Sequence, residues 1–94
     1  MGLFFEWDKN NASVNKSKHG VTFEEASTVF ADSLAVTIYD LVHSDEEDRY
    51  IILGESQRQR LLVVVFSDRD DRIRIISARV ATPGERKDYE KKGR

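Results

Sequence analysis

The stretch Leu-Leu-Val-Val-Val-Phe at residues 61–66 most limits the folds open to this chain, because every position in it is apolar. A strand with one face in water alternates apolar and polar residues, whereas a strand covered on both faces is apolar throughout. We therefore expect residues 61–66 to form the central strand of a sheet. The polar segment 67–71 leads directly into residues 72–79, which predicts an antiparallel hairpin of these two strands.

The second strand of this hairpin, Arg-Ile-Arg-Ile-Ile-Ser-Ala-Arg at residues 72–79, carries three arginines in eight positions. Arginine suits a planar, bidentate grip on phosphate, and it stays charged at any working pH. On a regular strand Arg72 and Arg74 share one face. Arg79 falls on the other face unless a twist or a bulge at the strand end re-aims it. We interpret the strand as part of an anion-binding surface.

The alternative for these arginines is cross-strand pairing with acids such as Asp68 or Glu55. We expect one of the three arginines to be paired in this way, but not all three. The charge distribution favours an anionic partner, since residues 1–48 hold three lysines against ten acids and residues 49–94 hold twelve basic residues against seven acids. The net charges are −7 and +5, although two such halves can also neutralise each other within one fold.

The rest of the chain predicts three helices and three further strands. Thr22 and Thr82 each begin a capping box, with a glutamate three residues later, and Asp8 is a third N-cap signal. Gly20 is suited to ending the first helix. The expected elements are a strand at 3–7, a helix at 9–18, a helix from 23 that ends at 32–33, a strand at 34–39, a strand at 49–53 followed by Gly54 and a polar turn, and a helix from 83.

This order, β-α-α-β-β-β-β-α, predicts an α+β fold in which two early helices cover one face of a mainly antiparallel sheet. A length of 94 residues predicts one domain over 1–94. The chain has no cysteine, which excludes disulfides and thiolate zinc sites. It has neither a leader pattern nor an apolar run of membrane-spanning length, so we expect a soluble cytoplasmic protein.

Two histidines and a tyrosine are candidates for acid/base chemistry. His19 lies at a helix end, where it either moves protons or interacts with the helix dipole. His43 opens the loop His-Ser-Asp-Glu-Glu-Asp-Arg, in which imidazole, carboxylates and Arg49 gather, although the acids also read as a solvated turn. His43 and Asp45 match no zinc signature, so no metal or cofactor is predicted. Tyr89 either donates a proton or anchors the last helix.

Several strings, in order and over nearly the whole chain, resemble the BrnT family of bacterial toxins. They are Phe-Glu-Trp-Asp at 5–8, Asn-Lys-Ser-Lys-His-Gly at 15–20, Val-Thr-Phe-Glu-Glu-Ala at 21–26, Val-Phe-Ala-Asp at 29–32, His-Ser-Asp-Glu-Glu-Asp-Arg at 43–49, Arg-Ile-Ile-Ser-Ala-Arg at 74–79, Ala-Thr at 81–82, Glu-Arg at 85–86 and Tyr-Glu at 89–90.

The resemblance implies a ribonuclease toxin with the fold of the RelE/ParE superfamily. It also implies a ribbon-helix-helix antitoxin, BrnA, which neutralises the toxin in a heterotetramer of two toxins and two antitoxins and represses the shared operon by binding operator DNA. The chemistry expected of such a toxin is metal-independent RNA cleavage by the ribose 2′-OH. The acidic balance departs from the strongly basic surfaces usual in RNA-binding proteins.

Residue type alone assigns the catalytic roles. Arg74 and Arg79 fit the cation that stabilises phosphorane charge, and His19 or His43 fits the acid or base. Arg49 is expected near the site, and Tyr89 is a further contributor. Two other functions stay open at this point: a non-enzymatic module that binds an acidic protein segment, and a toxin of the same fold aimed at a non-RNA target such as gyrase.

Overall fold

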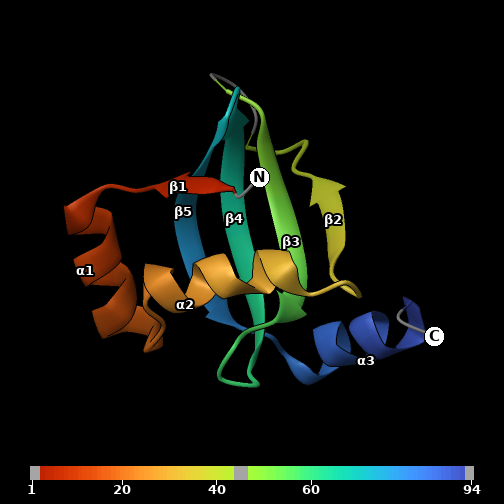
Figure 1. Ribbon diagram of the computed structural model, residues 1–94. Helices are drawn as coiled ribbons and strands as arrows, with labels where there is room; N and C mark the ends of the chain where they lie inside the picture. The colour runs from red at the N-terminus through yellow and green to blue at the C-terminus, as the bar shows by residue number, and fades with distance from the viewer. Residues whose placement is uncertain (1–2, 44–46, 93–94) are drawn as a thin grey trace.

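The computed structural model describes residues 3–43 and 47–92 (Figure 1). Its sheet has the strand order β1-β5-β4-β3-β2, in which β1 runs parallel to β5 and every other pair is antiparallel. The predicted class and element order are therefore confirmed. The elements are β1 (Phe4–Glu6), α1 (Lys9–His19), α2 (Phe23–Thr28), the 3₁₀ turn η1 (Val29–Ala31), β2 (Val36–Tyr39), β3 (Arg49–Glu55), β4 (Leu61–Arg69), β5 (Arg72–Val80) and α3 (Pro83–Lys92).

The helix caps form where the sequence predicts them. The Asp8 carboxylate accepts hydrogen bonds from the backbone N–H groups of the second and third residues of α1, and Gly20 ends that helix at φ 69°. Thr22 caps α2 by accepting from Glu25 N at 3.1 Å. Thr82 and Glu85 complete the second capping box, with Glu85 Oε1 2.9 Å from Thr82 N. These bonds satisfy N–H groups that helix ends leave without intrahelical partners.

The core lies between the helices and one face of the sheet. Helix α2 crosses this face in Figure 1, and α1 packs beside β5. The buried residues of the helical layer are apolar, and they meet alternate residues of the three central strands. The cluster consists of Val21, Phe23, Ala26, Val29, Ile52, Leu62, Val64, Phe66, Ile73, Ile75 and Ala78.

Helix α1 docks through a polar residue, because its sequence offers little apolar surface. The Asn15 side chain is buried, and its amide nitrogen donates to Val21 O at 3.0 Å and Ala78 O at 2.8 Å. Its amide oxygen accepts from Ala78 N at 3.0 Å. Strand β1 pairs with β5 at residues 72–74. The Asn15 amide therefore bonds the backbone of β5 further along, in place of a strand.

The structure corrects the ends of two predicted strands. Strand β3 continues past Leu53 to Glu55, so Gly54 lies within it. Its lack of a side chain has a steric reason, since a Cβ would lie 3.0 Å from the Ala35 Cβ and 3.3 Å from the Val29 carbonyl oxygen. The predicted turn 67–71 is shorter than expected, because β4 continues to Arg69 and the chain reverses at Asp70, which has φ 54°.

Strand β5 contains a bulge that decides where its arginines point. Val65 of β4 faces Ser77, but the next residue, Phe66, faces Ile75, so Ile76 is an extra residue on β5. The extra residue shifts the alternation of faces by one. Residues 73 and 75 before the bulge and 78 after it are buried against the helices. Arg74 and Arg79 consequently share the opposite face, which a regular strand forbids.

Candidate active site

The face of the sheet opposite α1 and α2 carries the candidate site. Cross-strand pairing puts Arg49, Ser67 and Arg74 in one row across β3, β4 and β5, where Ser67 lies between the two arginines. Neighbouring strands are about 4.8 Å apart, so the Cα atoms of Arg49 and Arg74 are separated by about 10 Å. Two long guanidinium side chains at that spacing can contact a single phosphate. The structure therefore brings these two predicted residues together.

Arg74 belongs to a cluster of arginines around one glutamate. The Glu6 carboxylate of β1 lies 3.6 Å from Arg74, 3.4 Å from Arg72 and 4.0 Å from Arg69. Arg69 also pairs with Glu47 at 2.7 Å, and Arg72 lies 4.0 Å from Asp71, so Arg74 is left with a carboxylate that it shares with two other arginines. The expected partners Asp68 and Glu55 were wrong for Arg72 and Arg74. Their acid comes from the parallel strand β1 instead.

His43 lies at the same end of the sheet as Arg49. Asp40 follows β2, and its backbone N–H donates to the Arg49 carbonyl at 2.8 Å. Its carboxylate, 9% exposed, lies 3.1 Å from His43 Nδ1 and also accepts from His43 N. Because an ionised carboxylate only accepts hydrogen bonds, this contact selects the neutral tautomer of His43 in which Nδ1 carries the proton and Nε2 has the lone pair. A carboxylate that fixes the tautomer in this way prepares an imidazole to act as a base.

Two residues that follow His43 in the chain, Glu47 and Asp48, are hydrogen-bonded to strands of the sheet. The Tyr39 hydroxyl donates to Asp48 Oδ1 at 2.7 Å. Arg69 Nη2 donates to Glu47 Oε2 at 2.7 Å, and this bond lowers the pKa of Glu47. Asp45, considered above as a metal ligand, lies outside the described residues. Within the described chain no group of three or more His, Asp or Glu side chains is arranged to hold a metal ion.

Arg79 lies at the other end of β5 in a different environment. Its two terminal nitrogens each donate to one oxygen of Glu85 at 2.8 Å. This hydrogen bonding lowers the pKa of Glu85 to about 2. All three arginines of the strand therefore have a carboxylate partner, contrary to expectation. Arg79 differs from the others because its guanidinium fork is matched by a complete carboxylate.

Tyr89 and His19 lie apart from the row formed by Arg49 and Arg74. The Tyr89 hydroxyl donates to Asp32 Oδ2 at 2.6 Å, which anchors α3 to the segment after η1. Burial, followed by this bond to Asp32, raises the pKa of Tyr89 to about 12. His19 is the exposed last residue of α1, and it lines a shallow hollow with Lys18, Ile76 and other neighbours. The six predicted residues thus fall into three groups. Arg49, Arg74 and His43 lie at one end of the sheet, Arg79 and Tyr89 contact residues that hold α3, and His19 lies at the end of α1.

Sequence reasoning missed three residues of the site, namely Glu6, Asp40 and Ser67. The string Asp-Leu-Val-His at 40–43 places a carboxylate three residues before His43, a spacing that suits an Asx turn. Ser67 fell in the predicted turn, and Glu6 acts only through the pairing of β1 with β5. The Ser67 hydroxyl is buried in the middle of the row, and it has no hydrogen-bond partner in the part of the chain that the structure describes.

The fold is that of a small α+β ribonuclease toxin of known structure. The 1.1 Å crystal structure of the Brucella abortus ribonuclease toxin BrnT matches with a TM-score of 0.63 and 20% sequence identity. The match covers 86% of this chain and 99% of that chain. At this level of identity the likeness establishes the fold alone.

The sequence itself establishes the family. The family model described as the ribonuclease toxin BrnT of a type II toxin-antitoxin system matches residues 7–85. The chain therefore belongs to the BrnT family of ribonuclease toxins, and as a type II toxin it has a cognate antitoxin. The resemblance drawn from the sequence is confirmed. No curated protein matches the chain. None of the described helices has the length and apolar character required to cross a membrane.

Proposed function

We propose that this toxin cleaves RNA without a metal ion, at the end of the sheet that carries His43, Arg49 and Arg74. The observation that carries the proposal is the row in which Arg49 and Arg74 flank Ser67. It lies at the same end of the sheet as an imidazole whose Nε2 is left as an acceptor by Asp40. Fixed cations and an oriented base are two of the three requirements of this reaction, and the third is an acid that protonates the leaving oxygen.

The proposed reaction is an internal transesterification. His43 Nε2 removes the proton of the ribose 2′-OH, and the 2′ oxygen forms a bond to the adjacent phosphorus. The bond from phosphorus to the 5′ oxygen breaks, and that oxygen takes up a proton. The products are a 2′,3′-cyclic phosphate and a 5′-hydroxyl end. Arg49 and Arg74 stabilise the extra negative charge on the phosphorane oxygens.

The remaining predicted residues take other roles in this proposal. Arg79 and Tyr89 fix α3 through Glu85 and Asp32. His19 lies at the end of α1, away from the row of Arg49 and Arg74, and takes no part in the proposed reaction. We infer that the antitoxin is a BrnA-type ribbon-helix-helix protein, which forms a heterotetramer of two toxins and two antitoxins that binds operator DNA. With RNA as the substrate, we infer that the toxin acts in the cytoplasm.

The test is cleavage of a defined RNA by the purified protein with and without EDTA. We expect cleavage to persist in EDTA and to leave 2′,3′-cyclic phosphate ends. The variants Arg74→Ala and His43→Ala should each lose about 100-fold or more in rate. Arg58→Ala is the matched control, because Arg58 has a 70% exposed side chain on the 56–60 loop, and its rate should stay within about twofold.

Three results would contradict the proposal. The first two are cleavage that stops in EDTA and products with 5′-phosphate ends. The third is intact RNA from folded protein both as free RNA and as mRNA on bacterial ribosomes. That last result would favour a non-enzymatic binding module or a toxin aimed at gyrase, and a DNA supercoiling assay separates these two.

A further inference from the structure

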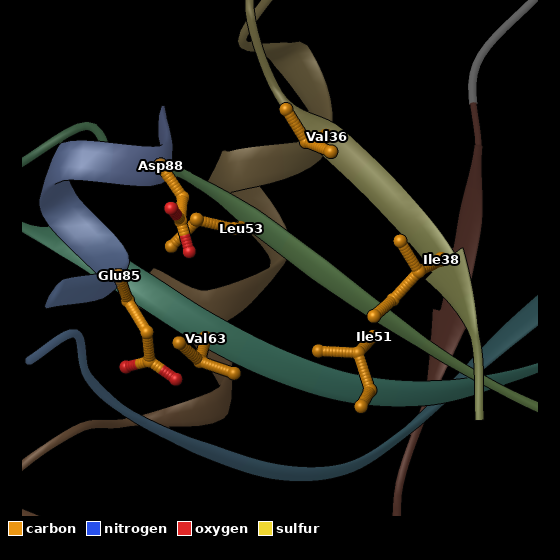
Figure 2. A pocket seen from close by; sticks show the side chains of 7 residues that line it. All are labelled: Val36, Ile38, Ile51, Leu53, Val63, Glu85 and Asp88. Carbon is orange, nitrogen blue, oxygen red and sulfur yellow. The ribbon is translucent and has the colours of Figure 1, made fainter. Parts of the chain in front are cut away.

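A groove on the open face of the sheet lies beside the proposed active site. Its volume is about 410 Å³, and its floor is made of apolar side chains from three neighbouring strands. Helix α3 forms one wall, where two carboxylates face the groove (Figure 2). The lining residues are Val36 and Ile38 of β2, Ile51 and Leu53 of β3, Val63 of β4, and Glu85 and Asp88 of α3.

The floor of this groove continues the rows that contain the arginines. Ile51 pairs with Val65 of β4, and Val65 pairs with Ser77, one row away from Arg49 and Arg74. The apolar surface also reaches the edge strand β2, where Ile38 is 55% exposed. Leu34, Leu41 and Val42, which stand just before and after this strand, are exposed apolar residues as well. Such a concentration of exposed apolar side chains marks a contact surface.

The dimensions and the layering indicate the kind of segment that fits. The floor spans three strands, which is about 10 Å, and an α-helix with its side chains is about 10–12 Å wide. A sheet whose central strand is apolar on both faces needs a layer on each face. Helices α1 and α2 supply one layer, and a helix lying beside α3 would supply the other.

The charges around the groove exclude RNA as the preferred occupant and orient a protein segment. Glu85 and Asp88 at one end repel phosphates, whereas they attract basic side chains. Glu85 is already held by Arg79, so Asp88, which is exposed, is the acid available to a partner. At the other end the Arg74 guanidinium, which shares the Glu6 carboxylate with two other arginines, attracts an acidic side chain. The groove therefore has an acidic residue, Asp88, at one end and a basic residue, Arg74, beyond the other.

We propose that this groove receives an amphipathic helix of the cognate antitoxin. The apolar stripe of that helix covers Ile38, Ile51 and Val63, a basic residue lies beside Asp88, and an acidic residue at the opposite end contacts the row of Arg49 and Arg74. This placement closes the active site by covering its cations. This docking site rests on the antitoxin partner of the proposed function, but it does not depend on RNA cleavage.

The test measures the dissociation constant between the purified toxin and its cognate antitoxin. We expect Ile38→Glu to weaken binding at least about tenfold, because it places a charge on the apolar contact. Asp88→Lys should weaken it by about threefold to tenfold through the lost and reversed charge. Val14→Glu is the matched control, since Val14 is 63% exposed on α1, and it should bind within about twofold of the wild type. Thermal unfolding checks that each variant is folded.

Any of three results would overturn the inference. One is antitoxin binding that is unchanged in both groove variants. Another is loss of RNA binding in Ile38→Glu with antitoxin binding retained, which assigns the groove to RNA. The third is a wild-type toxin dimer that dissociates in Ile38→Glu while antitoxin binding is unchanged, which assigns it to a second copy. If the wild type cleaves no RNA but groove variants lose the antitoxin, the docking site stands and the proposed function fails.

Discussion

Strand β5 carries Arg74 near one end and Arg79 near the other. These two arginines share a face but have different partners. At one end the Glu6 carboxylate is shared by Arg74, Arg72 and Arg69 at distances of 3.4–4.0 Å. At the other end Arg79 makes two bonds of 2.8 Å with Glu85. A bidentate pair occupies the donors that a phosphate would use, whereas a shared and distant carboxylate leaves them available. On the number and length of these bonds we predict that Arg79 is structural and Arg74 functional.

The largest effect expected from this comparison is on catalysis. Arg74→Ala should lower the rate of RNA cleavage by about 100-fold to 1000-fold, because a cation at the developing charge is lost. Its effect on the free energy of unfolding should stay below about 1 kcal/mol, since Arg74 is loosely paired. Rates on a defined RNA and urea unfolding measure the two quantities. A stability loss as large as the catalytic loss would show that Arg74 is structural.

A second arginine with a tight partner, Arg60, extends the comparison to the buried part of the molecule. The Glu25 carboxylate is 6% exposed, and it accepts from Arg60 Nε at 2.9 Å and from Ser56 Oγ at 2.7 Å. The bond from Arg60 lowers the pKa of Glu25. Glu25→Ala should lower the free energy of unfolding by about 3 kcal/mol, because the cation loses its partner. Glu24→Ala, an exposed change on the same helix, should cost below about 0.5 kcal/mol.

The Arg79 end should respond to pH in a defined direction. Because the folded-state pKa of Glu85 is lowered from 4.5 to about 2, its contribution to stability is present above pH 4.5. That contribution is lost as the pH falls from 4.5 towards about 2. Glu85→Gln should cost about 1 kcal/mol at pH 7, allowing for solvent screening, and the difference from the wild type should shrink over this window.

Glu90→Gln on the same helix is the control for this pH series, because Glu90 is exposed. Cleavage is measured on the same proteins. If Glu85→Gln or a folded Arg79→Ala variant loses cleavage as severely as Arg74→Ala, the active site lies at the Arg79 end and the comparison is reversed.

The smallest effect concerns the other anchor of α3. Tyr89→Phe removes one hydrogen bond to Asp32, which keeps its bonds from Glu55 N and Leu34 N, so the cost should be about 1 kcal/mol. In the wild type the hydroxyl should titrate only near its raised pKa of about 12. Ultraviolet titration should show this late component in the wild type and not in the variant. Loss of cleavage without loss of stability would give Tyr89 a role in catalysis instead.

Local sequence signals predicted the elements, because caps and strand patterns depend on neighbours along the chain. Thr22, Thr82 and Asp8 each satisfy N–H groups within three residues, so their roles are visible in the sequence. The partner of Arg74 was not predictable in this way. Glu6 is 68 positions away, and only the parallel pairing of β1 with β5 brings it near. Ser67 was hidden because β4 extends beyond its apolar run.

The face on which Arg79 lies was the feature hardest to predict from the sequence. A regular strand places Arg74 and Arg79 on opposite faces, and no residue at 75–77 is of a type that predicts a bulge. The bulge is confirmed only by the pairing of β4 with β5, in which one residue of β5 has no counterpart. The Asn15 amide holds the backbone of Ala78 just beyond it, and this contact spans 63 positions.

Because Ile76 is an extra residue, the number of residues in this strand determines which face each later side chain occupies. Removal of that one residue would leave the chemistry of every side chain intact and yet exchange the two sides of residues 77–80. A guanidinium would then be directed into the hydrocarbon beneath α1, and the methyl group of Ala78 would be directed into water. In this strand a single-codon deletion is therefore more damaging than most substitutions, because it changes which side of the molecule each later residue serves.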